Sequence, residues 1–331
     1  MPLPAFEYTA PKTAAKAISA QKASGKFLAG GTDLFVAMKE RITAPDFLVD
    51  MGGIARLKGI KRNKKTNELR VGALTTLSQL EEDPLIREQF PFLNTAVSLV
   101  STLQLRNMGT LGGNLCLDTR CYYYNQPSFL KKRWKPCLKI GGKICHVVKG
   151  SDVCHAVYSG DLAGILIALG AGIRVEGVGD SREMQLREFF TGSGIKPNIL
   201  KFNEILTEVM IPPLPEYSGF SYRKLRLRDT VDFPLLGVAV FVRLENEGGK
   251  CRDVRLVLGA VGPAPVVVEK APRLMLGKRI TPELIDEVAR AARKIAHPVD
   301  NTASSPRYRR EMIPVFIRKA FDEALERLKV G

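Results

Sequence analysis

The chain has few of the residues and motifs from which common enzyme sites are built. Only three histidines and one tryptophan occur among its 331 residues. The nucleophile motif G-x-S-x-G and the zinc motif H-E-x-x-H are absent, which leaves little material for a hydrolase. The G-x-G-x-x-G and P-loop sequences are absent too, so Rossmann and P-loop nucleotide sites lose their main support.

Long apolar segments are also missing. The longest uninterrupted run of apolar residues and glycine is Leu162–Ile173, whereas a membrane-spanning helix needs about 20 residues. The N-terminus lacks a basic segment followed by an apolar one, so we expect no signal peptide and a cytoplasmic protein. The length and an apolar fraction of 45% indicate a globular chain of roughly two domains.

Negative charge is scarce. The formal net charge is +16 at pH 7. Such an excess favours an acidic partner, which could be a nucleic acid, an anionic membrane surface or an acidic protein. Charge alone does not choose among these three.

Six cysteines are present, and five of them lie between positions 116 and 154. The stretches between them are rich in glycine, proline and lysine, and carry too little apolar surface for a core. A metal centre could hold such a segment together, because its binding free energy is also folding free energy. The wide gaps, without any C-x-x-C pair, favour an iron–sulfur cluster. The candidate ligands are Cys121, Cys137, Cys145 and Cys154.

Other interpretations of the cysteines stay open at this point. Zinc and a set of free thiols are the alternatives to a cluster. Cys116 is a fifth candidate ligand, or a buried thiol beside the preceding Gly112-Gly113 turn. His146 and His155 each follow a cysteine directly, so we expect them behind the ligands or on the surface. Cys251 lies in a strand-like run and is expected to be an ordinary strand residue.

Periodicity and turn residues predict mixed helices and strands up to a boundary at Pro212-Pro213. Helices are expected at 14–24, 34–41, 76–81, 84–88, 92–100, 162–169 and 185–190, and strands at 26–29, 46–50, 69–73, 172–176 and 204–211. After the boundary, strands at 220–227, 235–244 and 251–261 precede amphipathic helices at 281–296 and 306–328. Strands followed by helices are typical of a compact α+β domain.

Two glycine turns are candidates for holding a cofactor phosphate. Residues 28–34 contain Gly30-Gly31 between a strand and a helix, where backbone N–H groups can bind an anion. Residues 110–114 contain Gly112-Gly113, and we expect them to offer two bare amides, a hydroxyl and a carboxamide. Together with the cysteines, the turns indicate a dinucleotide cofactor beside a redox centre.

These motifs resemble the FAD-carrying medium subunit of xanthine oxidase-type molybdenum hydroxylases. Residues 29–34 are similar to its first FAD loop and residues 104–114 to its second; further similar segments are 71–76, 159–162, 220–224 and 308–310. The resemblance covers essentially the whole chain. It implies an α+β fold, in which residues 1–214 form an FAD-binding domain of the vanillyl-alcohol-oxidase/PCMH type with two α/β subdomains. Residues 215–331 would form a CO-dehydrogenase-flavoprotein-like α+β domain, with a three-stranded antiparallel sheet and helices.

Residues 116–157 are an insertion relative to ordinary members of this family. The insertion resembles that of the beta subunits of 4-hydroxybenzoyl-CoA reductases, which carries an extra [4Fe-4S] cluster. The resemblance implies that Cys121, Cys137, Cys145 and Cys154 are the cluster ligands and that Cys116 is not.

The resemblance also implies roles in FAD binding. The two glycine turns would surround the pyrophosphate. Asp161 would bond the polar chain of the cofactor or cap the following helix. Lys224 would approach the flavin, where a cation favours the reduced anion, unless it is an exposed strand lysine. The expected FAD contacts are Phe27, Leu28, Ala29, Gly30, Gly31, Thr32, Asp33, Leu34, Val100, Thr110, Leu111, Gly112, Gly113, Asn114, Asp161, Leu206 and Lys224.

The implied function is electron transfer, with no catalytic residue in this chain. Eight basic and two acidic residues in 116–158 form a basic rim that would steer an acidic ferredoxin. Electrons would pass through the [4Fe-4S] cluster and FAD to two [2Fe-2S] clusters of a small subunit. They would end on the molybdopterin of a large subunit, which would convert 4-hydroxybenzoyl-CoA to benzoyl-CoA in anaerobic aromatic degradation. The expected assembly is a heterotrimer, dimerised.

Two alternatives remain. The first is the FAD subunit of another molybdenum hydroxylase with a different substrate. The second is a basic iron–sulfur protein that binds nucleic acid. The paired FAD loops argue against the second, because a nucleic-acid binder needs neither, so we expect no nucleic-acid partner and no membrane span.

Overall fold

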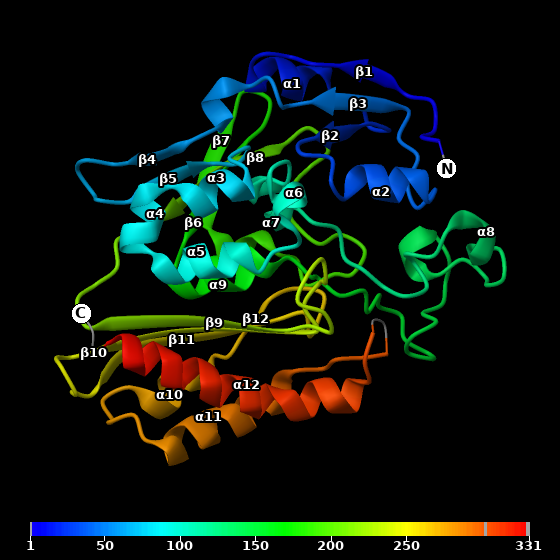
Figure 1. Ribbon diagram of the computed structural model, residues 1–331. Helices are drawn as coiled ribbons and strands as arrows, with labels where there is room; N and C mark the ends of the chain where they lie inside the picture. The colour runs from blue at the N-terminus through cyan, green and yellow to red at the C-terminus, as the bar shows by residue number, and fades with distance from the viewer. Residues whose placement is uncertain (1, 301–302, 329–331) are drawn as a thin grey trace.

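A computed structural model describes residues 2–300 and 303–328. Its strands form three sheets, shown in Figure 1. A parallel three-stranded sheet has the order β1-β3-β2, and an antiparallel five-stranded sheet has the order β4-β5-β8-β6-β7. The third sheet, β12-β11-β10-β9, is antiparallel and carries the C-terminal helices on one face. The expected α+β fold class is confirmed.

The first two sheets are built from strands and short helices of the N-terminal two thirds. The strands are β1 (Glu7–Thr9), β2 (Lys26–Leu28), β3 (Phe47–Asp50), β4 (Ile60–Arg62), β5 (Leu69–Gly72), β6 (Gly172–Glu176), β7 (Ser181–Gln185) and β8 (Ile205–Ile211). The α-helices are α1 (Ala14–Ala20), α2 (Leu34–Lys39), α3 (Leu77–Glu82), α4 (Pro84–Gln89), α5 (Pro91–Ser98), α6 (Leu103–Arg106), α7 (Leu111–Leu115), α8 (Ser128–Lys131) and α9 (Asp161–Leu169). The 3-10 helices are η1 (Ala55–Leu57), η2 (Leu138–Ile140) and η3 (Leu186–Phe189).

The C-terminal part follows the predicted order of strands and then helices. Its strands are β9 (Ser218–Leu225), β10 (Leu236–Leu244), β11 (Cys251–Gly259) and the two-residue β12 (Val266–Val267), which the sequence analysis did not predict. Its helices are α10 (Lys270–Met275), α11 (Pro282–Ile295) and α12 (Pro306–Arg327). As predicted, Thr281 caps α11 and Pro282 occupies its first turn.

Helix α9 lies at the centre of the molecule, and all nine of its residues are buried. It belongs to a hydrophobic core that extends from β5 and β8 to Phe220, Phe241 and Val257 of the C-terminal sheet. The opposite face of that sheet packs against α10, α11 and α12 in a second core. The longest apolar run of the sequence is therefore explained by burial of α9 on every side, not by a membrane.

No helix in residues 2–300 and 303–328 combines the length and the apolar character needed to cross a bilayer. This finding agrees with the absence of a long apolar run in the sequence.

A buried arginine ties α12 to the C-terminal sheet. Arg309 is fully buried, and its guanidinium donates hydrogen bonds to the carbonyl oxygens of Leu235, Val299 and Ala260. Burial lowers the pKa of Arg309 to about 10, so the side chain remains charged at neutral pH. The bonds satisfy carbonyl groups that would otherwise lose their hydration.

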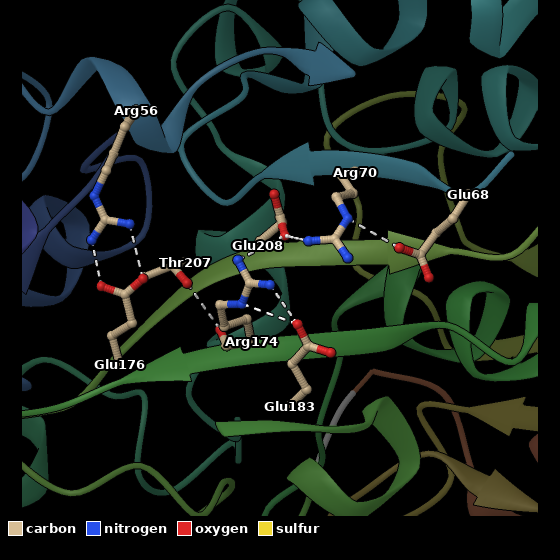
Figure 2. A network of polar contacts seen from close by, with 8 residues as sticks. All are labelled: Arg56, Glu68, Arg70, Arg174, Glu176, Glu183, Thr207 and Glu208. Carbon is tan, nitrogen blue, oxygen red and sulfur yellow. Dashed lines mark hydrogen bonds and ion pairs between the residues drawn. The ribbon is translucent and has the colours of Figure 1, made fainter. Parts of the chain in front are cut away.

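One face of the five-stranded sheet carries alternating charges, as Figure 2 shows. Arg174 of β6 lies opposite Glu208 of β8 and Glu183 of β7, and it pairs with both. Glu208 also pairs with Arg70 of β5 at 3.2 Å. Each partly exposed pair contributes little alone, but cross-strand pairs of opposite charge favour this register over a shifted one.

A buried carboxylate directly before β8 makes the free energy of unfolding depend on pH. The side chain of Glu204 is 6% exposed and pairs with Arg182 of β7 at 2.8 Å. The hydrogen bonds from Arg182 lower the pKa of Glu204 to about 2. An acid with a lowered pKa contributes stability above its unfolded pKa and loses it as the pH falls towards the folded value.

We expect Glu204→Gln to lower the free energy of unfolding at pH 7 by about 2 kcal/mol. The difference from the wild type should shrink as the pH falls from about 4.5 towards 2, because the wild-type carboxylate becomes protonated. Urea unfolding, followed by circular dichroism at several pH values, measures the loss at pH 7 and its decrease at lower pH. Glu183→Gln, at a half-exposed pair, is the control, with an expected loss below about 0.5 kcal/mol. A pH-independent loss in Glu204→Gln would contradict the assignment.

Candidate functional site

The first glycine turn, residues 28–34, joins β2 to α2 and is open to an anion. A Cβ on Gly30 would lie 1.8 Å from the carbonyl oxygen of Met108, so no side chain fits there. Gly31 has a φ of +71°, which also favours glycine. In the described part of the chain, the N–H groups of Gly30, Gly31 and Thr32 have no hydrogen-bond acceptor. These amides beside the start of α2 are suited to a diphosphate.

The second glycine turn lies against the first. A Cβ on Gly109 would lie 3.6 Å from the hydroxyl of Thr32. The backbone of this turn is fixed by hydrogen bonds from Leu77 N to Gly109 O and from Gly112 N to Ala73 O, both 2.8 Å. Gly112 packs so tightly that a Cβ would lie 2.7 Å from the Cβ of Ala73. Close packing between chain segments therefore requires glycine at 112.

The expectation that residues 110–114 offer bare polar groups is wrong. Thr110 is the N-cap of α7, and its hydroxyl accepts from Gly113 N at 3.0 Å. The amide of Gly112 bonds within the protein, and the Asn114 carboxamide oxygen accepts from Leu162 N at 3.2 Å. The segment forms a short helix, whose capping uses the groups that the sequence analysis left free.

A buried ion pair lies next to Asn114. Asp161 and Lys224 have side chains that are 5% and 1% exposed, and they approach within 3.0 Å. Tyr222 donates to the same carboxylate at 3.0 Å, and Lys224 also donates to Leu99 O at 3.0 Å. Burial raises the pKa of Asp161, and Lys224 opposes this shift. The alternatives of an exposed Lys224 and of Asp161 as a helix cap are excluded, because the Lys224 side chain is buried and Gly160 is the N-cap of α9.

The apolar FAD contacts expected from the sequence lie in the core. Val100 and Leu206 are buried in the hydrophobic core that contains α9. Val100 directly follows Leu99, whose carbonyl oxygen Lys224 binds. Phe27 is partly buried in β2 and packs against a separate small core. The sequence-predicted residues thus gather in two neighbouring groups, one at the first glycine turn and one around Lys224.

Four of the cysteines surround one small pocket. Its other lining residues include Tyr123, Tyr124, His146 and His155, so both predicted neighbouring histidines lie at its wall. Within residues 2–300 and 303–328, no three histidine, cysteine or acidic side chains lie close enough together to hold a single metal ion. The thiols that line the pocket are those of Cys121, Cys137, Cys145 and Cys154.

Backbone N–H groups influence two of these thiols. Burial raises the pKa of Cys121 and of Cys154, and nearby backbone N–H groups partly oppose this shift, those of Tyr123 and Tyr124 at Cys121 and that of Ala156 at Cys154. N–H groups directed at thiolate sulfurs are a means by which proteins tune iron–sulfur clusters.

The remaining two cysteines are elsewhere. Cys116 lies outside the pocket and next to Tyr158, and burial raises the pKa of its thiol to about 12. Cys251 begins β11 and is buried, as predicted for a strand residue. Neither is placed to ligate a centre shared by the other four.

The segment that carries the pocket has almost no core of its own. Of residues 116–155, all of which the structure describes, Thr119 is the single buried one. The segment is held by Lys139, whose side chain is 4% exposed and whose ammonium bonds Asp118, Thr119 and Gly194 O at 2.6–2.8 Å. The predicted lack of apolar packing is confirmed.

The basic rim is smaller than the sequence count indicates. The side chain of Lys139 is enclosed by its hydrogen-bond partners, and Arg120 pairs with Asp33 of the first glycine turn at 3.2 Å. Burial raises the pKa of Asp33, and Arg120 opposes that shift. The exposed basic residues of the segment are Lys132, Arg133, Lys135, Lys143 and Lys149.

Sequence reasoning missed several residues that organise this region. Tyr222 bonds Asp161, and the buried hydroxyl of Tyr158 donates to the carbonyl oxygens of Asn114 and Leu115. Arg120 was counted only as surface charge. No local pattern marks such residues, because each partner is distant in sequence.

Comparison with known proteins identifies the family. Residues 4–214 match the FAD binding domain in molybdopterin dehydrogenase, and residues 220–324 match the CO dehydrogenase flavoprotein C-terminal domain. The chain belongs to the FAD-binding subunits of the molybdenum hydroxylases. This assignment covers most of the chain and agrees with the two glycine turns.

Several relatives of these FAD-binding subunits are similar over most of the chain. The aldehyde oxidoreductase FAD-binding subunit PaoB of Escherichia coli is 33% identical, over 81% of this chain and 85% of its own. The carbon monoxide dehydrogenase medium chain of Hydrogenophaga pseudoflava is 28% identical, over 98% of both chains. A crystal structure of carbon monoxide dehydrogenase from that organism has a TM-score of 0.82 at 26% identity, covering 99% of each chain.

The residues present fit an FAD. The free amides of the first turn suit its diphosphate, and Lys224 provides a fixed cation in the neighbouring group of predicted contacts. Bound FAD supplies reversible one- and two-electron transfer. The first glycine turn would hold the phosphates, and the Asp161–Lys224 pair would fix the charges nearby.

We expect Gly30→Ala to weaken FAD binding at least tenfold, because its methyl group forces the two glycine turns apart. The dissociation constant is measured by fluorescence titration of the flavin-free chain. Gly164→Ala is the control, because its methyl group would lie 3.7 Å from Val257, an ordinary contact. Unchanged affinity in Gly30→Ala would refute the assignment of this turn.

We expect Lys224→Met to lower the free energy of unfolding of the flavin-free chain by about 3–5 kcal/mol at pH 7, because the Asp161 carboxylate stays buried without its cation. The loss should diminish at lower pH, where protonation neutralises Asp161. Urea unfolding measures it, with the exposed Lys58→Met as control. A loss equal to that of the control would contradict a buried ionic pair.

Proposed function

We propose that this subunit carries electrons between a [4Fe-4S] cluster and FAD. The observation that supports this most strongly is that the four thiols of Cys121, Cys137, Cys145 and Cys154 line one pocket. The segment around that pocket contacts the first glycine turn through Arg120 and Asp33. Two redox sites placed next to each other in one chain are suited to electron relay.

The donor set supports an iron–sulfur cluster. The four candidate ligands are soft thiols, which suit iron–sulfur clusters or zinc. Tyr123 packs edge-to-face on Trp134 at 5.6 Å and lies 5.2 Å from the ring of His146, which shields the pocket. A bound [4Fe-4S] cluster supplies one-electron transfer, and the protein tunes its potential by this shielding.

The external partners follow from the family and the charge. A large molybdopterin subunit and a small subunit with two [2Fe-2S] clusters would complete the enzyme. The exposed basic residues beside the pocket are suited to an acidic ferredoxin, whose binding should weaken with salt. The insertion's resemblance to 4-hydroxybenzoyl-CoA reductases favours reductive removal of the ring hydroxyl from 4-hydroxybenzoyl-CoA by the partner subunit.

A second candidate function is the FAD subunit of a molybdenum hydroxylase that acts on another substrate. The relatives named for carbon monoxide, nicotinate and aldehyde oxidation support it. It needs no cluster in this chain, so the two candidates differ in metal content.

The decisive measurement is the iron, zinc and flavin content of the anaerobically purified chain, together with its visible and EPR spectra. We expect about four irons and one FAD per chain. FAD with zinc, or FAD without metal, would reject the cluster and favour the second candidate.

We expect Cys137→Ser to abolish the four-iron EPR signal and leave FAD bound, because the pocket loses one thiolate and the glycine turns are untouched. Cys251→Ser is the matched control and should keep its iron, because Cys251 lies in β11. Four irons per chain in Cys137→Ser would refute the ligand assignment.

A further inference from the structure

One ion pair connects the cysteine segment to the first glycine turn. Arg120 Nη1 lies 3.2 Å from Asp33 Oδ1, and the two residues are 87 positions apart in the sequence. Arg120 directly precedes Cys121, whose thiol lines the pocket. Asp33 directly follows Gly30, Gly31 and Thr32, whose amides are free in the described part of the chain.

Arg120 makes two further contacts. Its backbone exchanges two hydrogen bonds of 2.7 Å with Val157, which closes the base of the segment. Its guanidinium lies 4.3 Å from the ring centre of Phe233, in the loop between β9 and β10. The side chain thus bridges the cysteine segment, the glycine turn and the C-terminal part. A flat guanidinium can bond a carboxylate and stack on an aromatic ring at the same time, which an ammonium does less well.

The order of the cysteine segment depends on what links its thiols. Thr119 is the single buried residue of 116–155, so apolar packing contributes little to holding this segment. A group bound by the four thiols would cross-link positions 121 to 154 and restrict Arg120 at the base. A restricted Arg120 in turn restricts Asp33, at the end of the turn that holds the amides.

We propose that Arg120 is a positioning residue that couples the cysteine pocket to the FAD turn. Occupation of the thiol pocket strengthens FAD binding, and FAD binding strengthens occupation of the pocket by the same factor. In the metal-free chain, FAD binding orders the cysteine segment through Arg120 and thereby slows reaction of its thiols. One of the two tests below relies on the proposed cluster, whereas the other uses the metal-free chain. The coupling would ensure that neither redox site is filled efficiently without the other.

The first test measures FAD affinity by fluorescence titration of the full chain, with and without iron–sulfur reconstitution. In the wild type, we expect loading to tighten FAD binding about 5- to 10-fold. Arg120→Ala should bring this ratio close to one, and Arg120→Lys should restore part of it. Arg133→Ala, an exposed basic residue of the same segment, should keep the wild-type ratio.

The second test follows alkylation of Cys121 by iodoacetamide in the metal-free chain, with mass spectrometry as the readout. Saturating FAD should slow alkylation several-fold in the wild type and in Arg133→Ala, but not in Arg120→Ala. Because this readout needs no metal, it tests the coupling even if the chain binds no iron.

The outcomes separate the two proposals. Absence of iron together with FAD protection of Cys121 would reject the cluster and support the coupling. If the chain binds iron but reconstitution tightens FAD binding equally in Arg120→Ala and Arg133→Ala, the coupling would be overturned and the cluster would stand. Unprotected Cys121 in the wild type would also overturn the coupling.

Discussion

The structure depends on the buried ion pair between Asp161 and Lys224. Asp161 begins α9, the helix whose residues are all buried, and Lys224 lies on β9 of the C-terminal sheet. Neither charge is stable in the interior without the other, so the pair specifies how the N-terminal part meets that sheet. Tyr222 and the carbonyl of Leu99 satisfy the remaining hydrogen bonds.

The same pair organises the cofactor region. Leu162, next to Asp161, donates to the side chain of Asn114 and thereby fixes α7, which contains the second glycine turn. The preceding Gly109 packs beside Thr32 of the first turn. The core of the molecule thus determines where the turns lie, while the free amides of the first turn remain for a ligand. The polar groups of the second turn maintain this arrangement instead of facing outward.

The cysteine segment follows a different principle. It lacks apolar packing and is attached to the core by polar contacts, mainly those of Lys139 and Arg120. A segment of this kind can be added to an existing fold, because it leaves the core of α9 and the sheets unchanged. The proposed cluster would add a second redox site beside the FAD turn without a new hydrophobic core.

The sequence by itself determined the periodic elements, such as α9, α11 and the long C-terminal strands, because their apolar patterns and caps are local. It also predicted that four of the six cysteines gather in one place, and they line one pocket. Short elements such as β1, β4 and β12 escaped prediction, because three residues or fewer hold a strand only through its neighbours. Only the tertiary structure decided that Gly112, Asn114 and Asp161 bond within the protein, and that Arg120 meets Asp33. Their partners are distant in sequence, and no local pattern records which buried polar groups satisfy one another.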